Sequence, residues 1–224
     1  MVFDKVNKSF GILFLFILLI EVISNRSAEL STIHTVAMPL LLAYLFLFFY
    51  LRRDGVNKIS KICLLIALGS AFIGDILLSK EISIFRLENN SGMIFHSLAH
   101  LSLVVLFYNK RNIKTKGYNY LLLLFIIGGI YMYLNYKFQY NTHFSLENLL
   151  QLILILMIIF FSILRKDNVP RDSFILILSG SLLLLSSFMF LSFRKFLEFN
   201  THDLIMVPYS LSFLCFVTGI LKEN

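Results

Sequence analysis

The chain has 224 residues, of which 58% are hydrophobic and only 15% are charged. Its mean hydropathy of +0.82 lies well above the values of water-soluble domains, so the composition excludes an ordinary soluble globular protein. The net charge of +7 indicates membrane topology and an affinity for anionic headgroups. No nucleic-acid partner is expected, because no basic stretch is interleaved with aromatic residues in a soluble segment.

Long apolar stretches recur from end to end, and a helix of about 20 residues crosses the ~30 Å hydrocarbon core of a membrane. Strands are disfavoured, because barrel strands alternate apolar and polar residues whereas these stretches are apolar on every face. The longest linker, 79–91, has 13 residues, so the sequence predicts one all-α transmembrane domain over 1–224. Its eight transmembrane helices are predicted at roughly 10–24, 33–51, 59–78, 92–108, 118–136, 147–164, 173–193 and 204–221.

The first predicted helix also has features of a signal peptide. Lys5 and Lys8 precede the apolar stretch FGILFLFILLI, which is the order of a charged and then an apolar signal region. Glu21 and Arg26, however, stand where a small-residue cleavage site would be needed. We therefore expect this helix to be retained.

The distribution of Lys and Arg predicts the orientation. The amino end, the linkers after the second, fourth and sixth helices, and the carboxyl end, together with Lys61 in the first turn of the third helix, hold 14 of the 20 basic residues. The other four linkers hold 6. Basic residues favour the cytoplasmic side, so both termini are expected to be cytoplasmic. The protein is expected in the cell membrane, which is the inner membrane if the source is bacterial.

Polar side chains within the spans are concentrated in the outer half of the predicted bundle. They include Glu21, His34, Asp75, His96, His100, Gln151, Ser187 and Tyr209. His34 and Tyr209 lie near helix starts and are expected at the interface. An ionisable group deeper in a span is costly and indicates function, which favours Asp75 and His100 as site residues. His96 is either part of that site or a histidine bonded to a backbone carbonyl.

Helical spacing brings the candidate residues together. Gly92, His96 and His100 are four residues apart and so share one stripe of the fourth helix. The third and fourth helices are expected to be antiparallel neighbours, which would place Asp75 and His96 at similar depth, facing each other. A carboxylate beside two imidazoles is suited to proton transfer. The same set is also a plausible metal-ligand set, so a metal-dependent lipid hydrolase stays open as an alternative, although no third histidine is evident and no cofactor is expected.

The blocks GSAFIGDILL and GMIFHSLAH resemble the YhhN family of eight-helix membrane proteins, which includes the lysoplasmalogenases. The block GSLLLLSSFMFLSFRKF at 180–196 fits a further family block without a gap. The matching positions are Gly74, Asp75 and Leu78 in the first block, Gly92 and His100 in the second, and Tyr209 and Gly219 near the carboxyl end. The resemblance implies hydrolysis of the vinyl ether bond of a lysoplasmalogen or related lysolipid, giving a fatty aldehyde and a glycerophospho-base.

On this basis, Asp75, His100 and His96 are predicted to be catalytic. The predicted substrate-binding residues are Gly74, Gly92, Ser187, Tyr209 and Glu21. Vinyl ether cleavage needs an acid to protonate the alkene carbon and help for the attacking water. Asp75 is the expected acid, and its partner is expected to be His100, His96 or Glu21.

Four positions depart from the family pattern towards apolar residues: Met38, Leu103, Phe188 and Phe213. Phe188 stands where the family has a second carboxylate, and Phe213 where it has a glutamine. A catalytically inactive member that binds lysolipid or a membrane partner is therefore the alternative to a hydrolase.

Overall fold

The computed structural model describes residues 2–26, 28–78, 90–114, 117–138, 146–193 and 201–223. These residues contain eight α-helices and one short 3-10 helix, and no strand is found among them. The linker predicted at 79–91 falls largely outside the described residues. The helices are α1 (Val2–Asn25), α2 (Ser31–Arg52), α3 (Lys58–Leu78), α4 (Asn90–Asn109), α5 (Tyr118–Phe138), α6 (Leu146–Leu164), α7 (Arg171–Phe193) and α8 (His202–Leu221).

The prediction of an eight-helix polytopic bundle is confirmed. Five helices (α2, α3, α4, α7 and α8) are long and apolar enough to cross a membrane, and α1, α5 and α6 contain shorter apolar stretches. Large apolar side chains point outward, including Ile12 at 69% and Phe125 at 70% exposure. In lipid such side chains need no partner, whereas the backbone polar groups must be satisfied within each helix. The chain is a multi-pass membrane protein.

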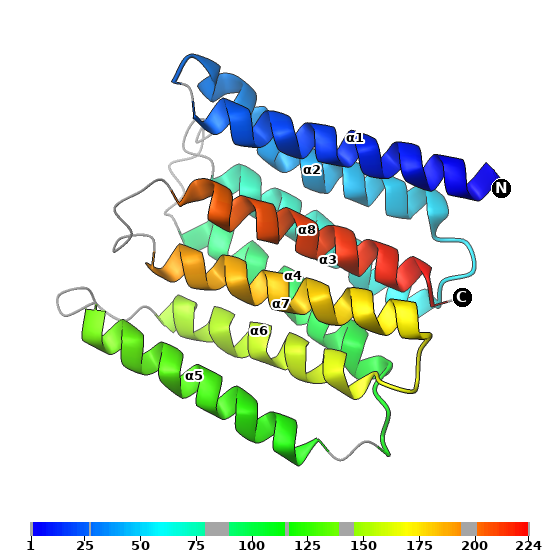
Figure 1. The fold of residues 1–224 in the computed structure, drawn as a ribbon, viewed down its shortest axis with the longest axis vertical. Coiled ribbons are helices and arrows are strands. Elements are labelled where there is room, and N and C mark those ends of the chain that lie inside the picture. The colour runs from blue at the N-terminus through cyan, green and yellow to red at the C-terminus, as the bar shows by residue number, and fades with distance from the viewer. Residues whose placement is uncertain are drawn as a thin grey trace.

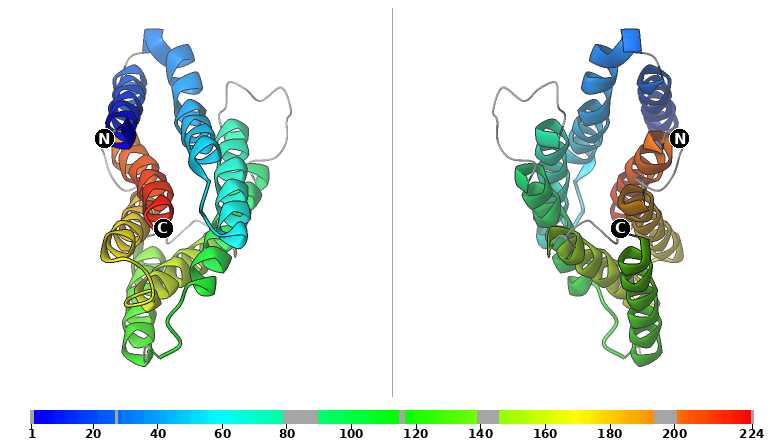
Figure 2. Two further views of the ribbon diagram at one scale, coloured as in Figure 1. Left: turned by 90° about the vertical axis from the view of Figure 1, so that its right-hand side faces the viewer. Right: turned by 90° about the vertical axis from the view of Figure 1, so that its left-hand side faces the viewer.

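The helices form two layers that meet at both edges (Figure 2). One layer contains α1, α8 and α7, and the other contains α2, α3 and α4. The α1–α2 pair joins the layers at one edge, and α6 joins them at the other by contacting both α4 and α7. Helix α5 lies outside the layers and packs mainly on α6 (Figure 1).

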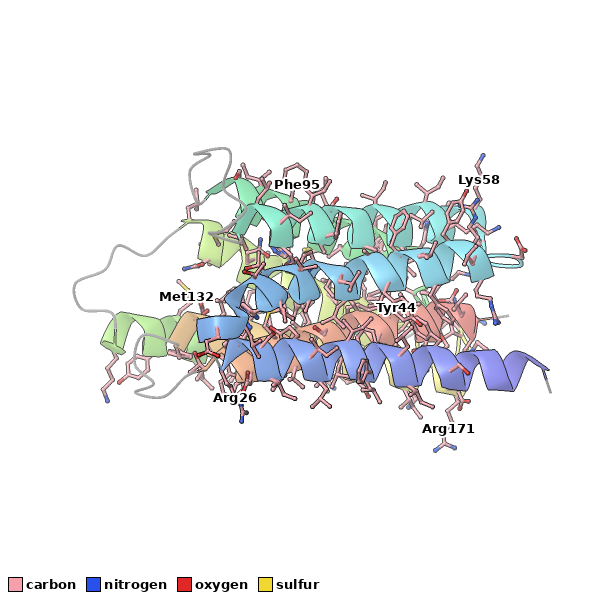
Figure 3. The ribbon with its side chains drawn as sticks, turned by 90° about the horizontal axis from the view of Figure 1, so that it is seen from above. Arg26, Tyr44, Lys58, Phe95, Met132 and Arg171 are labelled. Atoms are coloured by element: carbon pink, nitrogen blue, oxygen red, sulfur yellow. The ribbon has the colours of Figure 1, made fainter. Side chains whose placement is uncertain are left out.

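Both termini lie at the same end of the bundle (Figure 1). Lys58 and Arg171 project at that end, whereas Arg26 projects near the opposite end (Figure 3). The chain therefore crosses the bundle an even number of times, as predicted. The cytoplasmic location of the termini rests on the distribution of basic residues and stays a prediction.

Helices α3 and α4 cross closely where two glycines meet. A Cβ atom placed on Gly74 would lie 2.9 Å from the His96 ring and 3.2 Å from the carbonyl oxygen of Gly92. One placed on Gly92 would lie 2.6 Å from Cγ of Leu78 and 3.1 Å from the carbonyl oxygen of Gly74. The two glycines bring the backbones together and fix His96 against α3, and their role in substrate binding stays a prediction.

Candidate functional site

Asp75 lies in the last turn of α3 and is only 1% exposed. Its Oδ1 atom is 3.3 Å from Nε2 of His96 in α4. The hydroxyl of Tyr209 in α8 donates to both carboxylate oxygens, at 3.2 Å and 3.4 Å. Asp75 and His96 thus face each other as predicted, and a third helix adds a phenol.

Tyr209 is buried rather than interfacial. It is 9% exposed, and its ring lies edge-on to His96, with ring centroids 5.9 Å apart. Phe213, one turn further along α8, packs against it with a centroid distance of 5.2 Å. The expectation of an interfacial Tyr209 failed because α8 begins two residues earlier than predicted and packs between α7 on one side and α2 and α3 on the other, where the Tyr209 hydroxyl reaches Asp75.

His100 lies one turn beyond His96 on α4, with ring centroids 6.5 Å apart, and is 5% exposed. Its Nδ1 atom is 2.5 Å from Oε1 of Gln151 in α6. The Gln151 amide nitrogen donates to the carbonyl oxygen of Met93 at 3.1 Å and to Oγ of Ser97 at 2.8 Å. Because a carbonyl only accepts, these bonds orient the amide with its oxygen towards His100.

This orientation fixes the tautomer of His100. The Gln151 oxygen can only accept, so Nδ1 of His100 carries the hydrogen and donates it. In the neutral ring, Nε2 then carries a lone pair. Nε2 is buried and makes no hydrogen bond within the part of the chain that the structure describes. It is a positioned acceptor, and a water molecule or a ligand hydroxyl would satisfy it.

From the sequence, Gln151 is expected only as a polar residue near the outer start of the sixth helix. Its role as the partner of His100 is a contact between residues 51 positions apart. Helical spacing predicts neighbours three or four positions apart and carries no signal for this pair. Only the packing of α4 on α6 reveals it.

Glu21 does not join Asp75 in a direct contact but belongs to a separate cluster. It lies in the last turns of α1 and is completely buried. Its Oε1 atom is 2.7 Å from Nε2 of His202 and 3.4 Å from Nδ1 of His34. His202 was not predicted as a site residue. The cluster lies towards the bundle end opposite the termini, because His202 is the first residue of α8 and precedes Tyr209 by two helical turns.

Ser187 and Phe188 in α7 face different neighbours. The Ser187 hydroxyl donates to the carbonyl oxygen of Ile205 in α8 at 2.7 Å, so this predicted substrate ligand is engaged in helix packing. Phe188 is 7% exposed, and its ring lies 5.5 Å from that of Tyr131 in α5. Successive residues of a helix point about 100° apart, so a side chain at 188 is directed towards α5 when Ser187 faces α8.

The described residues contain one group of three side chains whose ligand atoms are close enough to share a metal ion: Glu21, His34 and His202. Asp75, His96 and His100 do not form such a group. Their arrangement is instead a buried carboxyl group in contact with an imidazole and a phenol, with a second imidazole one turn away. Groups of this kind can exchange protons.

Comparison with known proteins gives one result. The model of the YhhN family matches residues 31–220, which is most of the chain and includes α2 to α8 almost entirely. Neither curated proteins nor solved structures give a match.

Proposed function

Because the chain belongs to the YhhN family, we propose that it is a lysoplasmalogenase-type hydrolase, which cleaves the vinyl ether bond of a lysoplasmalogen or a related lysolipid. The observation that carries this proposal is the buried carboxyl group of Asp75 in contact with His96 and Tyr209. Such a group within a membrane span is costly and indicates function. Proton transfer within the membrane is the chemistry that this reaction needs.

The first step transfers a proton from the Asp75 carboxyl group to the alkene carbon remote from the ether oxygen. The C=C electron pair forms the new C–H bond, and an oxocarbenium ion remains at the carbon that bears the oxygen. His96, 3.3 Å from Asp75, holds the carboxyl group in place and exchanges protons with it between turnovers. General acid catalysis of this kind contributes about 100-fold or more to the rate.

The second step adds water to the oxocarbenium carbon. His100 is suited to accept the proton of that water, because Gln151 fixes the lone pair on the unbonded Nε2 atom. The resulting hemiacetal separates into a fatty aldehyde and the free glycerol hydroxyl. One proton is consumed and one is released, so the reaction needs water as its only co-substrate.

The distribution of side chains along the bundle supports a single-chain lipid as substrate. Asp75, His96 and Tyr209 lie in the half of the bundle opposite the termini, whereas the spans are mainly Leu, Ile, Phe and Val towards the termini. A hydrocarbon chain needs apolar surroundings, and the vinyl ether next to the glycerol lies where chain meets headgroup. We place the hydrocarbon chain of the lipid along the apolar half of the bundle and its vinyl ether bond at Asp75.

A substrate panel on detergent-purified protein tests this proposal. Vinyl ether, alkyl ether and acyl lysophospholipids with the same headgroup are offered side by side, and aldehyde, alcohol and fatty acid are measured. The expected result is aldehyde from the vinyl ether lipid alone, because an alkyl ether has no alkene carbon to protonate. Release of fatty acid from the acyl lipid would contradict the proposal. Binding of all three lipids without turnover would establish the alternative, an inactive family member that binds lysolipid.

A further inference from the structure

The cluster of Glu21, His34 and His202 plays no part in the proposed hydrolysis, yet its geometry is specific. The three residues come from the end of α1, the start of α2 and the first position of α8. One ligand atom from each lies within 4.8 Å of the other two. Three helix ends thus bring two imidazoles and a carboxylate to one point near the bundle end opposite the termini.

One hydrogen bond, between His202 and Glu21, accounts for only part of this cluster. Glu21 is completely buried, and its Oε2 atom makes no hydrogen bond among the described residues. The same holds for Nδ1 of His34, which lies 3.4 Å from Glu21 without forming one. Buried polar atoms are almost always paired, so these two indicate a missing partner. A metal cation attracts a carboxylate oxygen and an imidazole lone pair at once, whereas a hydrogen-bond acceptor attracts neither.

The spacing also fits a metal. Zinc binds histidine nitrogen at about 2.0–2.1 Å and carboxylate oxygen at about 2.0–2.2 Å, so the edges of a tetrahedral site measure about 3.3 Å. The distance between Glu21 Oε1 and His34 Nδ1 is 3.4 Å, which matches such an edge. The distance from Glu21 Oε1 to His202 Nε2 is 2.7 Å, so it must lengthen by about 0.6 Å to match this edge. The His202 side chain can move by that amount, because it is partly exposed at the start of a helix.

We propose that Glu21, His34 and His202 bind a divalent transition-metal ion, and that the ion is zinc. Two imidazoles with one carboxylate form a recognised zinc ligand set, in which three protein ligands leave a fourth position for water. His34 and His202 have side-chain exposures of 23% and 26%, so the ion can enter from the bundle end. The bound ion ties α1 and α2 to the start of α8.

The experiment measures metal bound to full-length protein purified in detergent with a histidine-free tag. The protein is stripped with a chelator, reloaded with Zn²⁺, freed of excess ion and analysed for metal content. Wild-type protein is expected to retain about one zinc ion per chain, and His34→Gln and His202→Gln are expected to retain essentially none. His96→Gln is the matched control, because it removes a histidine of the Asp75 cluster and should leave zinc content unchanged.

Cobalt substitution gives a second readout on the same variants. Co²⁺ in a tetrahedral site gives visible absorption bands, and a nitrogen–oxygen ligand set gives no intense thiolate band from Cys63 or Cys215. These bands should appear in wild-type and His96→Gln protein and be absent from His34→Gln and His202→Gln.

Three outcomes would overturn the proposal: folded wild-type protein that retains no zinc, undiminished zinc in both His34→Gln and His202→Gln, or zinc loss in His96→Gln alone. The last would move the metal to the Asp75 cluster. Metal content is measured without lipid, so its result is separate from that of the hydrolysis assay.

Discussion

At the scale of single residues, the most informative contact is that between His100 and Gln151. Gln151 is a positioning residue, because its amide oxygen accepts the Nδ1 hydrogen and leaves Nε2 as the base. Replacing it with leucine removes that acceptor and leaves a buried donor unpaired, which costs about 1–3 kcal/mol and frees the tautomer.

We therefore predict that Gln151→Leu lowers vinyl ether turnover about tenfold or more, whereas Gln151→Glu retains part of the activity. The glutamate keeps an oxygen that accepts from His100 but loses the bonds to Met93 and Ser97. The pH profile should also change in Gln151→Leu, because the protonation of His100 is no longer linked to a fixed acceptor. Full activity in Gln151→Leu, with an unaltered pH profile, would rule out this role.

At the scale of helices, the crossing of α3 and α4 holds Asp75 against His96. An alanine at Gly74 would place its Cβ atom 2.9 Å from the imidazole ring and 3.2 Å from the backbone of Gly92. Neither neighbour is the flexible end of a side chain, so the helices must separate. Overpacking of this kind costs about 1–3 kcal/mol.

Gly74→Ala is therefore expected to lower both the melting temperature and the turnover rate. Gly129→Ala is the matched control, because a Cβ atom there meets nothing within 4 Å and alanine favours helix over glycine. Thermal unfolding in detergent and lipid hydrolysis should be measured on both variants. Equal behaviour of the two would show that the close crossing is not what positions His96.

At this scale, the sequence predicts the helices and the contact between neighbouring α3 and α4, but not the contacts between helices far apart in the chain. Long apolar stretches locate all eight helices, and the four-residue spacing on α4 with an antiparallel α3 places Asp75 opposite His96. Contacts between helices far apart in the chain are not predictable in this way. His202 meets Glu21 across 181 positions, and Phe188 turns towards α5 because α7 is rotated to pack Ser187 on α8.

At the scale of the whole molecule, the carboxyl end is fixed by a buried arginine at the end of the bundle that carries the termini. Arg165 directly follows the last residue of α6 and is completely buried, and its guanidinium binds the carboxylate of Glu223. Oε2 of Glu223 also lies 3.6 Å from Nζ of Lys110. Burial lowers the pKa of Arg165 to about 10, so the guanidinium remains charged at neutral pH and needs its anion. Together, Lys110, Arg165 and Glu223 connect the ends of α4, α6 and α8.

Glu223→Gln is expected to lower the stability of the bundle by about 3–5 kcal/mol, because it leaves a buried charge without its counterion. Asp172→Asn is the control, since Asp172 pairs with Lys222 while 71% exposed, and exposed pairs contribute about 0–1 kcal/mol. Denaturant unfolding of both variants in detergent tests this. A loss in Glu223→Gln no larger than that in Asp172→Asn would contradict the account of the buried pair.

Topology is also a property of the whole molecule. Both termini lie at one end of the bundle, and 14 of the 20 basic residues belong to the segments assigned to that side. Reporters fused to either terminus should therefore show a cytoplasmic location. An external signal at the carboxyl terminus alone would mean that one helix does not span the membrane, with α1 the first to examine.

The central claim is that Asp75 supplies the proton for vinyl ether cleavage, and Asp75→Asn tests it most directly. Asparagine has nearly the same shape, keeps an oxygen that can accept from Tyr209 and removes the carboxyl proton. Aldehyde release from a vinyl ether lysolipid should fall about 100-fold or more in Asp75→Asn. It should be unchanged in Asp172→Asn, which makes the same substitution at an exposed position. Turnover by folded Asp75→Asn at the wild-type rate would contradict the claim.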